Sequence, residues 1–276
     1  MNDREMPLSR RLLDIAIEKM ADRFGEAQRV RRALANTIVA QLMSDCVIKG
    51  GSSLKFRYGD LATRVTKDMD VAQAKDLDDF ILRLDASLRS GWHGFTGHII
   101  RRPVATPKDV PPEYVMHPFD VKLEYNRKPW MTVRLEMGAN EVDDTEEADY
   151  SLSPDIVELF HALGLPKPNP VPLMKLHHQI AQKLHGLTDP SQNRPHDLVD
   201  LQLILSQSKV DLTLLRKTAI RLFDYRNRQP WPGIVHKGDD WEIGYDAAKY
   251  DLPVLPSVDE AVLWANDLIA KINEAK

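Results

Sequence analysis

The interpretation of this sequence depends on two nearby stretches, Ile48-Lys-Gly-Gly-Ser-Ser-Leu-Lys-Phe-Arg-Tyr-Gly59 and Arg64-Val-Thr-Lys-Asp-Met-Asp70. An apolar run at Cys46–Ile48 ends at the glycine pair, and a helical pattern resumes over Ser52–Tyr58, which predicts a strand, a tight turn and a helix. The residues of Asp68–Ala72 then alternate between polar and apolar, which is typical of a half-buried strand.

The same stretches carry the parts of a nucleotide site. Gly50 and Gly51 let backbone N–H groups approach a phosphate at the start of a helix, and Ser52 adds a hydroxyl donor. Asp68 and Asp70 are two residues apart on a strand, so both carboxylates face one side and can share Mg²⁺, or Mn²⁺ in its place. A glycine pair alone is usually a plain turn, and an Asp-x-Asp alone is usually a solvated strand face. Together, in this order, they predict nucleotidyl transfer from an NTP.

The two stretches closely resemble the AbiEii-type nucleotidyltransferases, a family that includes toxins of bacterial toxin-antitoxin and phage-defence systems. In that family a Gly-Gly-small-small-Leu segment precedes an Arg-x-Thr/Ser-x-Asp-hydrophobic-Asp segment. Two later blocks, Ala181–Leu187 and Arg194–Leu201, look like the later motifs of the family and stand in the same order. The resemblance covers residues 45–75 and 173–205.

The resemblance implies roles for individual residues. Lys183 is expected to contact the nucleotide phosphates, and Asp197 to be the acid that supports the site, with Asp200 as its substitute. A solvated lysine and a simple Arg194–Asp197 ion pair at a helix start are the alternative interpretations. The nucleotide-binding residues expected from the matched motifs are Gly50, Gly51, Ser52, Lys55, Arg64, Thr66 and Lys183.

A third metal carboxylate is expected on a later strand, because nucleotidyltransferase folds often place one beside the first pair. Glu136 is preferred, since its strand follows a predicted hairpin turn. Glu124 and Asp120, on the preceding strand, are the alternatives.

The rest of the chain predicts an α/β (α+β) protein, in which a nucleotidyltransferase-fold mixed sheet precedes a mainly α-helical C-terminal domain. Three prolines within Pro166–Pro170 mark the boundary, which gives domains at 1–168 and 169–276. Helical periodicity covers 8–42 with a break near Gly25, 77–88, 173–187, 196–205, 212–225 and 257–272, the last opening with a Ser257/Glu260 capping box. Further strands are expected at 98–101, 119–125 and 131–137. We expect residues 229–256 to form an irregular connection.

Composition sets few limits on function. The net charge is -4, from 37 basic and 41 acidic residues, so overall charge neither supports nor excludes RNA as a partner. No stretch of the sequence is apolar enough to act as a signal peptide or to span a membrane, which leads us to expect a cytoplasmic protein. Cys46 is the single cysteine and is expected to be buried.

The expected function is that of a toxin that transfers a nucleoside monophosphate from an NTP to an acceptor and releases pyrophosphate. The acceptor follows from the resemblance alone: some relatives modify the 3′ end of tRNA and so block translation, and a cognate antitoxin is expected as a partner. Transfer to a small molecule or a protein, and a non-catalytic nucleotide-binding role beside an antitoxin, are the alternatives. Basic residues compatible with RNA are Arg29, Arg31, Arg32, Arg216, Lys217, Arg221, Arg226 and Arg228.

Overall fold

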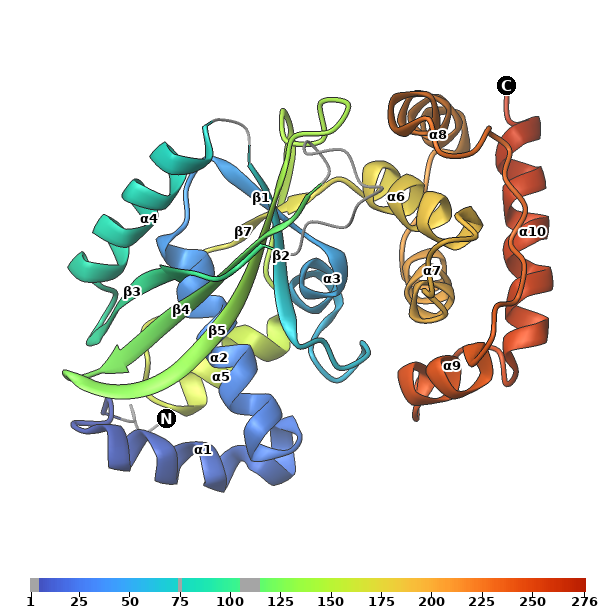
Figure 1. The fold of residues 1–276 in the computed structure, drawn as a ribbon. Coiled ribbons are helices and arrows are strands. Elements are labelled where there is room, and N and C mark those ends of the chain that lie inside the picture. The colour runs from blue at the N-terminus through green and yellow to red at the C-terminus, as the bar shows by residue number, and fades with distance from the viewer. Residues whose placement is uncertain (1–4, 74–75, 105–114) are drawn as a thin grey trace. The chain divides into compact units, whose positions relative to one another are not determined.

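The computed structural model describes residues 5–73, 76–104 and 115–276, which form two compact units (Figure 1). The sheet unit comprises Met1–Leu61, Val65–Asn140 and Ala148–Leu173. The helical unit comprises Met174–Lys276 together with two short segments, Ala62–Arg64 and Glu141–Glu147. The division expected at residue 168 is contiguous in sequence, whereas the helical unit also takes two short pieces from before that residue.

The sheet unit is built on a mixed sheet of seven strands in the order β3-β4-β5-β2-β1-β7-β6 (Figure 1). β2 pairs antiparallel with β1 and parallel with β5, while β1 also pairs parallel with β7. The predicted mixed sheet is therefore confirmed. The strands are β1 (Cys46–Lys49), β2 (Asp68–Gln73), β3 (Phe95–Arg101), β4 (His117–Tyr125), β5 (Lys128–Ala139), β6 (Ala148–Ser151) and β7 (Val171–Met174).

One face of this sheet forms the hydrophobic core with the helices. Met69 and Val71 of β2 belong to a buried cluster that includes residues of α1, α2, α4 and α5. Asp68 and Asp70 alternate with them along β2 and therefore lie on the opposite face. The helices of the unit are α1 (Arg10–Phe24), α2 (Ala27–Leu42), α3 (Gly50–Tyr58), α4 (Leu77–Ser90) and α5 (Pro154–Ala162).

The predicted hairpin between β4 and β5 is present. The two strands pair antiparallel, and the turn residues Asn126 and Arg127 have φ values of 47° and 62°. Two successive residues with positive φ are typical of the type I′ turn, whose twist matches that of a hairpin. Pro129, two residues after Arg127, lies in β5.

The helical unit contains five described helices, α6 (Leu176–Thr188), α7 (His196–Gln207), α8 (Leu212–Arg226), α9 (Trp241–Lys249) and α10 (Val258–Glu274). The Ser257 hydroxyl accepts a hydrogen bond from the Glu260 N–H at 3.3 Å, so the predicted start of the last helix is confirmed. None of the described helices has the length and apolar character needed to cross a membrane.

Two local predictions were wrong. Residues 229–256 contain helix α9, whose nine residues are too few to show a clear helical period between prolines. The helix expected from Leu173 begins at Leu176 instead, because Val171–Met174 form strand β7. Ile48 of β1 pairs with Leu173, and a pairing so distant in sequence leaves no local signal. Helix α5 and strand β6 were not predicted.

Candidate functional site

The glycine turn and the second acid of β2 lie directly against each other. Gly50 is the first residue of α3 and has a φ of 63°. A Cβ added to Gly50 would lie 2.0 Å from Oδ2 of Asp70 and 3.0 Å from its Cγ. Only glycine therefore fits between β1 and this carboxylate. The N-terminus of α3 and the Asp70 carboxylate share one location, which is the arrangement that nucleotidyl transfer at these residues requires.

The carboxylates form a row with the neighbouring strand. Asp70 lies opposite Glu136 of β5 in the parallel pair, and Asp68 lies opposite Arg134. Residues directly opposite each other in a sheet point to the same face. Burial raises the pKa of Glu136, and the charges of Asp70 and Asp68 raise it further, while Arg102 and Lys49 act in the other direction. Glu136 is thus close enough to both aspartates to be repelled by their charges.

The two alternative third carboxylates lie farther from β2. Asp120 is on β4 and is opposite Arg134, so β5 separates it from Asp68. It also accepts a hydrogen bond from Lys122 at 3.0 Å. Glu124 lies near the far end of β4, opposite Thr96 of β3. The position of Glu136 therefore favours it over both.

The donor set fits a hard divalent cation that substrate oxygens help to hold. Within residues 5–73, 76–104 and 115–276, no three His, Cys, Asp or Glu side chains form a ready-made metal site. Asp68 and Asp70 alternate on one face with only partial burial, and Mg²⁺ is commonly held by one or two carboxylates plus phosphates and water. Crowded carboxylates on a half-buried face are the environment that such a cation relieves.

Three other predicted nucleotide-binding residues are buried in the sheet unit, and two of them have side-chain hydrogen bonds there. The buried Ser52 hydroxyl donates to the Asp68 carbonyl at 3.0 Å and so ties α3 to β2. The ammonium of Lys55 donates to Asp60 at 2.7 Å. Thr66 is also buried, and its hydroxyl has no hydrogen-bond partner among the described residues. A direct contact of these side chains with a nucleotide stays a prediction.

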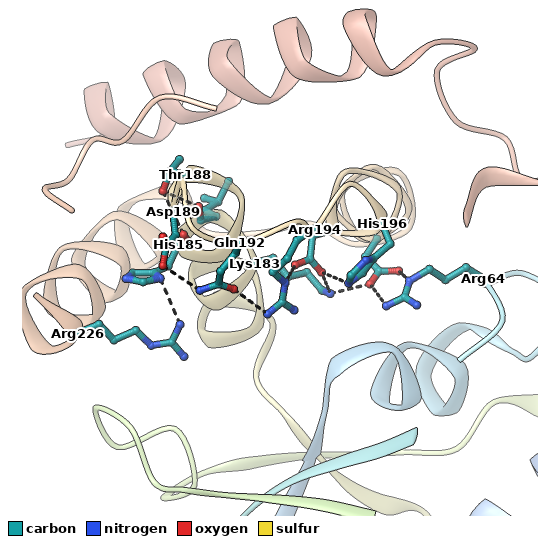
Figure 2. A network of polar contacts seen from close by, with 12 residues as sticks. Arg64, Lys183, His185, Thr188, Asp189, Gln192, Arg194, His196 and Arg226 are labelled. Carbon is teal, nitrogen blue, oxygen red and sulfur yellow. Dashed lines mark hydrogen bonds and ion pairs between the residues drawn. The ribbon is translucent and has the colours of Figure 1, made fainter. Parts of the chain in front are cut away.

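The other predicted residues meet in a buried ion cluster of the helical unit, shown in Figure 2. The Lys183 ammonium donates to Asp197 at 2.7 Å and to Asp200 at 2.6 Å. Arg64 binds Asp200 through two hydrogen bonds of 2.9 and 3.0 Å. Arg194 donates to Asp197 at 2.6 Å. The cluster brings Lys183, Asp197, Asp200 and Arg64 together and adds Arg194, for which the sequence suggests only a helix-start ion pair.

The charges of this cluster compensate for burial. Asp197 and Asp200 have no exposed surface, and burial alone would raise the pKa of each carboxyl. Arg194 and Lys183 outweigh that effect at Asp197, and Arg64 and Lys183 outweigh it at Asp200, so both pKa values are lowered. Both carboxylates are therefore ionised at neutral pH, and each is held by two cations.

At least four of the eight basic residues compatible with RNA form ion pairs within the fold. Arg29 pairs with Asp60, and Arg31 donates to Asp14 at 3.1 Å. In the helical unit, Arg221 donates to Asp143 at 2.6 Å, and Arg226 binds Glu141 through two hydrogen bonds. These pairs reduce the positive charge available to a polyanion, so the surface alone does not identify the acceptor.

Comparison with known proteins agrees with this geometry. Residues 32–267 match the sequence profile of the family described as nucleotidyl transferase AbiEii toxin, type IV toxin-antitoxin system. No curated protein matches the sequence. The structure is similar to that of MenT4, a nucleotidyltransferase toxin from Mycobacterium tuberculosis H37Rv, with a TM-score of 0.60 and 14% sequence identity. The alignment covers 98% of this chain and 91% of the MenT4 chain. JHP933 from Helicobacter pylori aligns with a TM-score of 0.45 at 17% identity, over 90% and 92% of the two chains, which is too low to bear on the fold.

The mixed sheet, with its glycine turn beside paired acids, is the arrangement expected of a nucleotidyltransferase-fold protein. The chain belongs to the AbiEii nucleotidyltransferase toxin family of type IV toxin-antitoxin systems, because the family profile matches most of its length. The resemblance inferred from the two sequence stretches is therefore confirmed, as is the fold class. Membership of this family supports a transferase enzyme that uses an NTP and has an antitoxin as a partner.

Proposed function

We propose that this protein transfers a nucleoside monophosphate from an NTP to the 3′ end of an RNA, with tRNA as the first candidate, and so blocks translation. An acceptor hydroxyl oxygen would attack the α-phosphorus, and the bond from that phosphorus to the bridging oxygen of pyrophosphate would break. The hydroxyl proton would pass to solvent or to a nearby carboxylate. Pyrophosphate would leave, and no covalent enzyme intermediate is needed.

The observation that carries this proposal is the approach of Gly50 to the Asp70 carboxylate. Phosphates bind readily at helix N-termini, where backbone N–H groups and the helix dipole favour negative charge. The acids of β2 beside that point are suited to a divalent cation, which supplies charge neutralisation to the phosphates when it is bound. A phosphate cradle and a metal site that meet at one point suit nucleotidyl transfer better than either feature alone.

The proposed roles combine the positions of residues in the sheet unit with the family motifs, which supply the roles of Lys183 and Asp197. Asp68, Asp70 and Glu136 would hold Mg²⁺, and Gly50, Gly51 and Ser52 would cradle the triphosphate. Lys183 would contact a phosphate, a role that comes from its match to the family motif; its ammonium also bonds Asp197 and Asp200. Asp197 would then act by fixing the position of that ammonium, with Asp200 and Arg64 completing the cluster.

The acceptor is proposed from the family rather than from the surface. Because RNA binding releases counterions, transfer to RNA should weaken steeply as salt rises, whereas transfer to a small molecule should change little. Labelling of a protein would be recognised by its resistance to ribonuclease. These responses separate the acceptor classes whichever base is added.

The test is to incubate the protein with each α-labelled NTP, Mg²⁺ and total RNA, and to resolve RNA, protein and small molecules separately. We expect label on RNA in the size range of tRNA, and none after chelation of the metal or in Asp70→Asn. The matched control is Asp79→Asn, because Asp79 is an exposed acid of α4 outside the site. Absence of label in every fraction from the wild-type protein would refute a transferase function.

A second comparison tests the third carboxylate. We expect Glu136→Gln to lose at least about 100-fold in transfer rate, because it removes an acid beside the reacting phosphates. Asp120→Asn and Glu124→Gln should lose far less, because β5 separates β4 from β2. A larger loss in Asp120→Asn or Glu124→Gln than in Glu136→Gln would transfer the role to that residue.

A further inference from the structure

Lys49 occupies a position in the sheet unit to which the family motifs assign no role. It is the last residue of β1 and precedes Gly50 directly, and only 9% of its surface is exposed. Lys49 lies opposite Asp70, which in turn lies opposite Glu136. Directly opposed residues share a face, so one cation and two acids form a row across three adjacent strands.

The ammonium of Lys49 reaches the far side of this row. A Cβ added to Gly138 of β5 would lie 3.1 Å from Nζ of Lys49. Because β2 separates β1 from β5, the lysine side chain crosses β2 on the face that carries the acids. Ala72, opposite Gly138 on β2, is also small. A glycine inside a strand often marks such a close approach, and here it leaves space for the ammonium and for the Met116 side chain, whose Sδ would lie 2.8 Å from the added Cβ.

This ammonium differs from those of the buried lysines Lys55 and Lys183. Lys55 is paired with Asp60, and Lys183 with two aspartates. Around Lys49, the described part of the chain provides no hydrogen bond or ion pair to Nζ, although its charge lowers the pKa of Glu136. A nearly buried cation without a directly bonded anion is costly, so a ligand that brings negative charge would bind favourably beside it.

We propose that Lys49 is a further substrate-contacting residue, whose ammonium binds a non-bridging phosphate oxygen of the nucleotide. The inference rests on the proposed function and adds a cation to the site within the sheet unit itself. Residues 49, 50 and 51 then act together: the ammonium provides a compact point charge, and the backbone of the following glycines provides N–H donors. Before the nucleotide binds, the same charge reduces the repulsion between Asp70 and Glu136.

The test compares Lys49→Met with Lys122→Met. Lys122 lies on β4 and points to the same face of the sheet, but its side chain is 38% exposed and bonded to Asp120. Equilibrium binding of labelled NTP with Mg²⁺ and no acceptor should weaken about 10- to 100-fold in Lys49→Met, as expected for loss of a charge-assisted hydrogen bond. KM for the NTP should rise by a similar factor, with a smaller change in kcat. Lys49→Arg should restore part of the affinity, and Lys122→Met should bind as the wild type does.

Gly138→Val provides an independent variant, because it fills the space beside Nζ without removing a charge. It should weaken NTP binding in the same direction as Lys49→Met. Lys49→Met should keep an unfolding midpoint close to that of the wild type, because relief from burying the charge offsets the lost attraction to Asp70 and Glu136, and the apolar stem is retained.

The outcomes separate the inference from the function on which it rests. The inference would be overturned if the affinity of Lys49→Met for NTP stayed within twofold of the wild-type affinity. This holds even if kcat or the Mg²⁺ requirement changed, because the lysine would then serve only as a counter-ion to the acids. A wild-type protein that neither binds NTP nor labels any acceptor would instead refute the proposed function.

Discussion

The substitution Gly50→Ala tests the geometry of the site most directly. The added Cβ would lie 2.0 Å from Oδ2 of Asp70, whereas ordinary van der Waals contact begins at 3.4 Å, so the carboxylate must move by about 3.4 − 2.0 = 1.4 Å. A misplacement of about 1 Å in a reacting constellation can cost about 100-fold in rate. The backbone adds a second cost, because alanine at a φ of 63° is disfavoured by about 1–2 kcal/mol.

A matched glycine separates these two effects. Gly25, between α1 and α2, also has a positive φ, 97°, but an added Cβ there would approach only the end of the Leu61 side chain, at 3.0 Å. Both variants should lose stability in urea unfolding because of the positive φ, while Gly50→Ala alone should lose at least about 100-fold in the initial rate of NTP-dependent labelling. Equal activity of the two variants would show that the glycine turn and Asp70 do not act together.

Three further predictions concern the buried groups. Arg64→Ala should lower the free energy of unfolding by about 3 kcal/mol in urea titrations, because it removes one partner of a fully buried carboxylate. Arg64→Lys should recover only part of this loss, because lysine cannot bind both oxygens of Asp200 in parallel. A loss below about 1 kcal/mol in Arg64→Ala would contradict this reasoning. Burial, assisted by the Arg226 charge, lowers the pKa of His185 to about 4. The unfolded chain therefore takes up a proton at a higher pH than the folded chain, and the free energy of unfolding should fall as pH drops from about 6.5 toward 4. His185→Gln should flatten this pH dependence, and an unchanged slope in that variant would refute the assignment to His185. Burial, assisted by the Asp45 charge, raises the pKa of the Cys46 thiol to about 12. A disulfide reagent at pH 8 should therefore modify this thiol only after the protein unfolds. Rapid modification of the native protein would show instead that the thiol is accessible.

Much of the fold could be predicted because its signals are local. Alternation along β2 placed Asp68 and Asp70 on one face, and the core position of Met69 between them confirms it. Gly25, with a φ of 97°, separates α1 and α2 as predicted. The buried position expected for Cys46 is also observed. Strand β7 could not be found in this way, because a four-residue strand is recognisable only through its pairing with β1.

In the candidate site, too, the features with local sequence signals could be predicted, and those that depend on long-range contacts could not. The glycine turn and the paired acids depend on residue spacing within about twenty positions, and the structure brings them together. The contacts of Arg64 and Lys49 depend on chain segments far apart in sequence. Asp200 is 136 residues from Arg64, and only the folded chain shows that they pair. Glycine at position 138 was the available sign of the Lys49 contact, but a single glycine in a strand has several explanations.

The composition of the helical unit limits how this protein can be divided or recombined. Residues 62–64 leave the sheet unit just before β2, and residues 141–147 leave it just after β5. They deliver Arg64 to Asp200 and Glu141 to Arg226. A chimera that fuses only residues 174–276 to another protein would lack Arg64 and Glu141, the partners of Asp200 and Arg226. The C-terminal helices of such a chimera would aggregate or misfold despite an intact apolar core. During synthesis on the ribosome, by contrast, both short segments emerge before helices α6 to α10. Arg64 and Glu141 are therefore already present when Asp200 and Arg226 are synthesised.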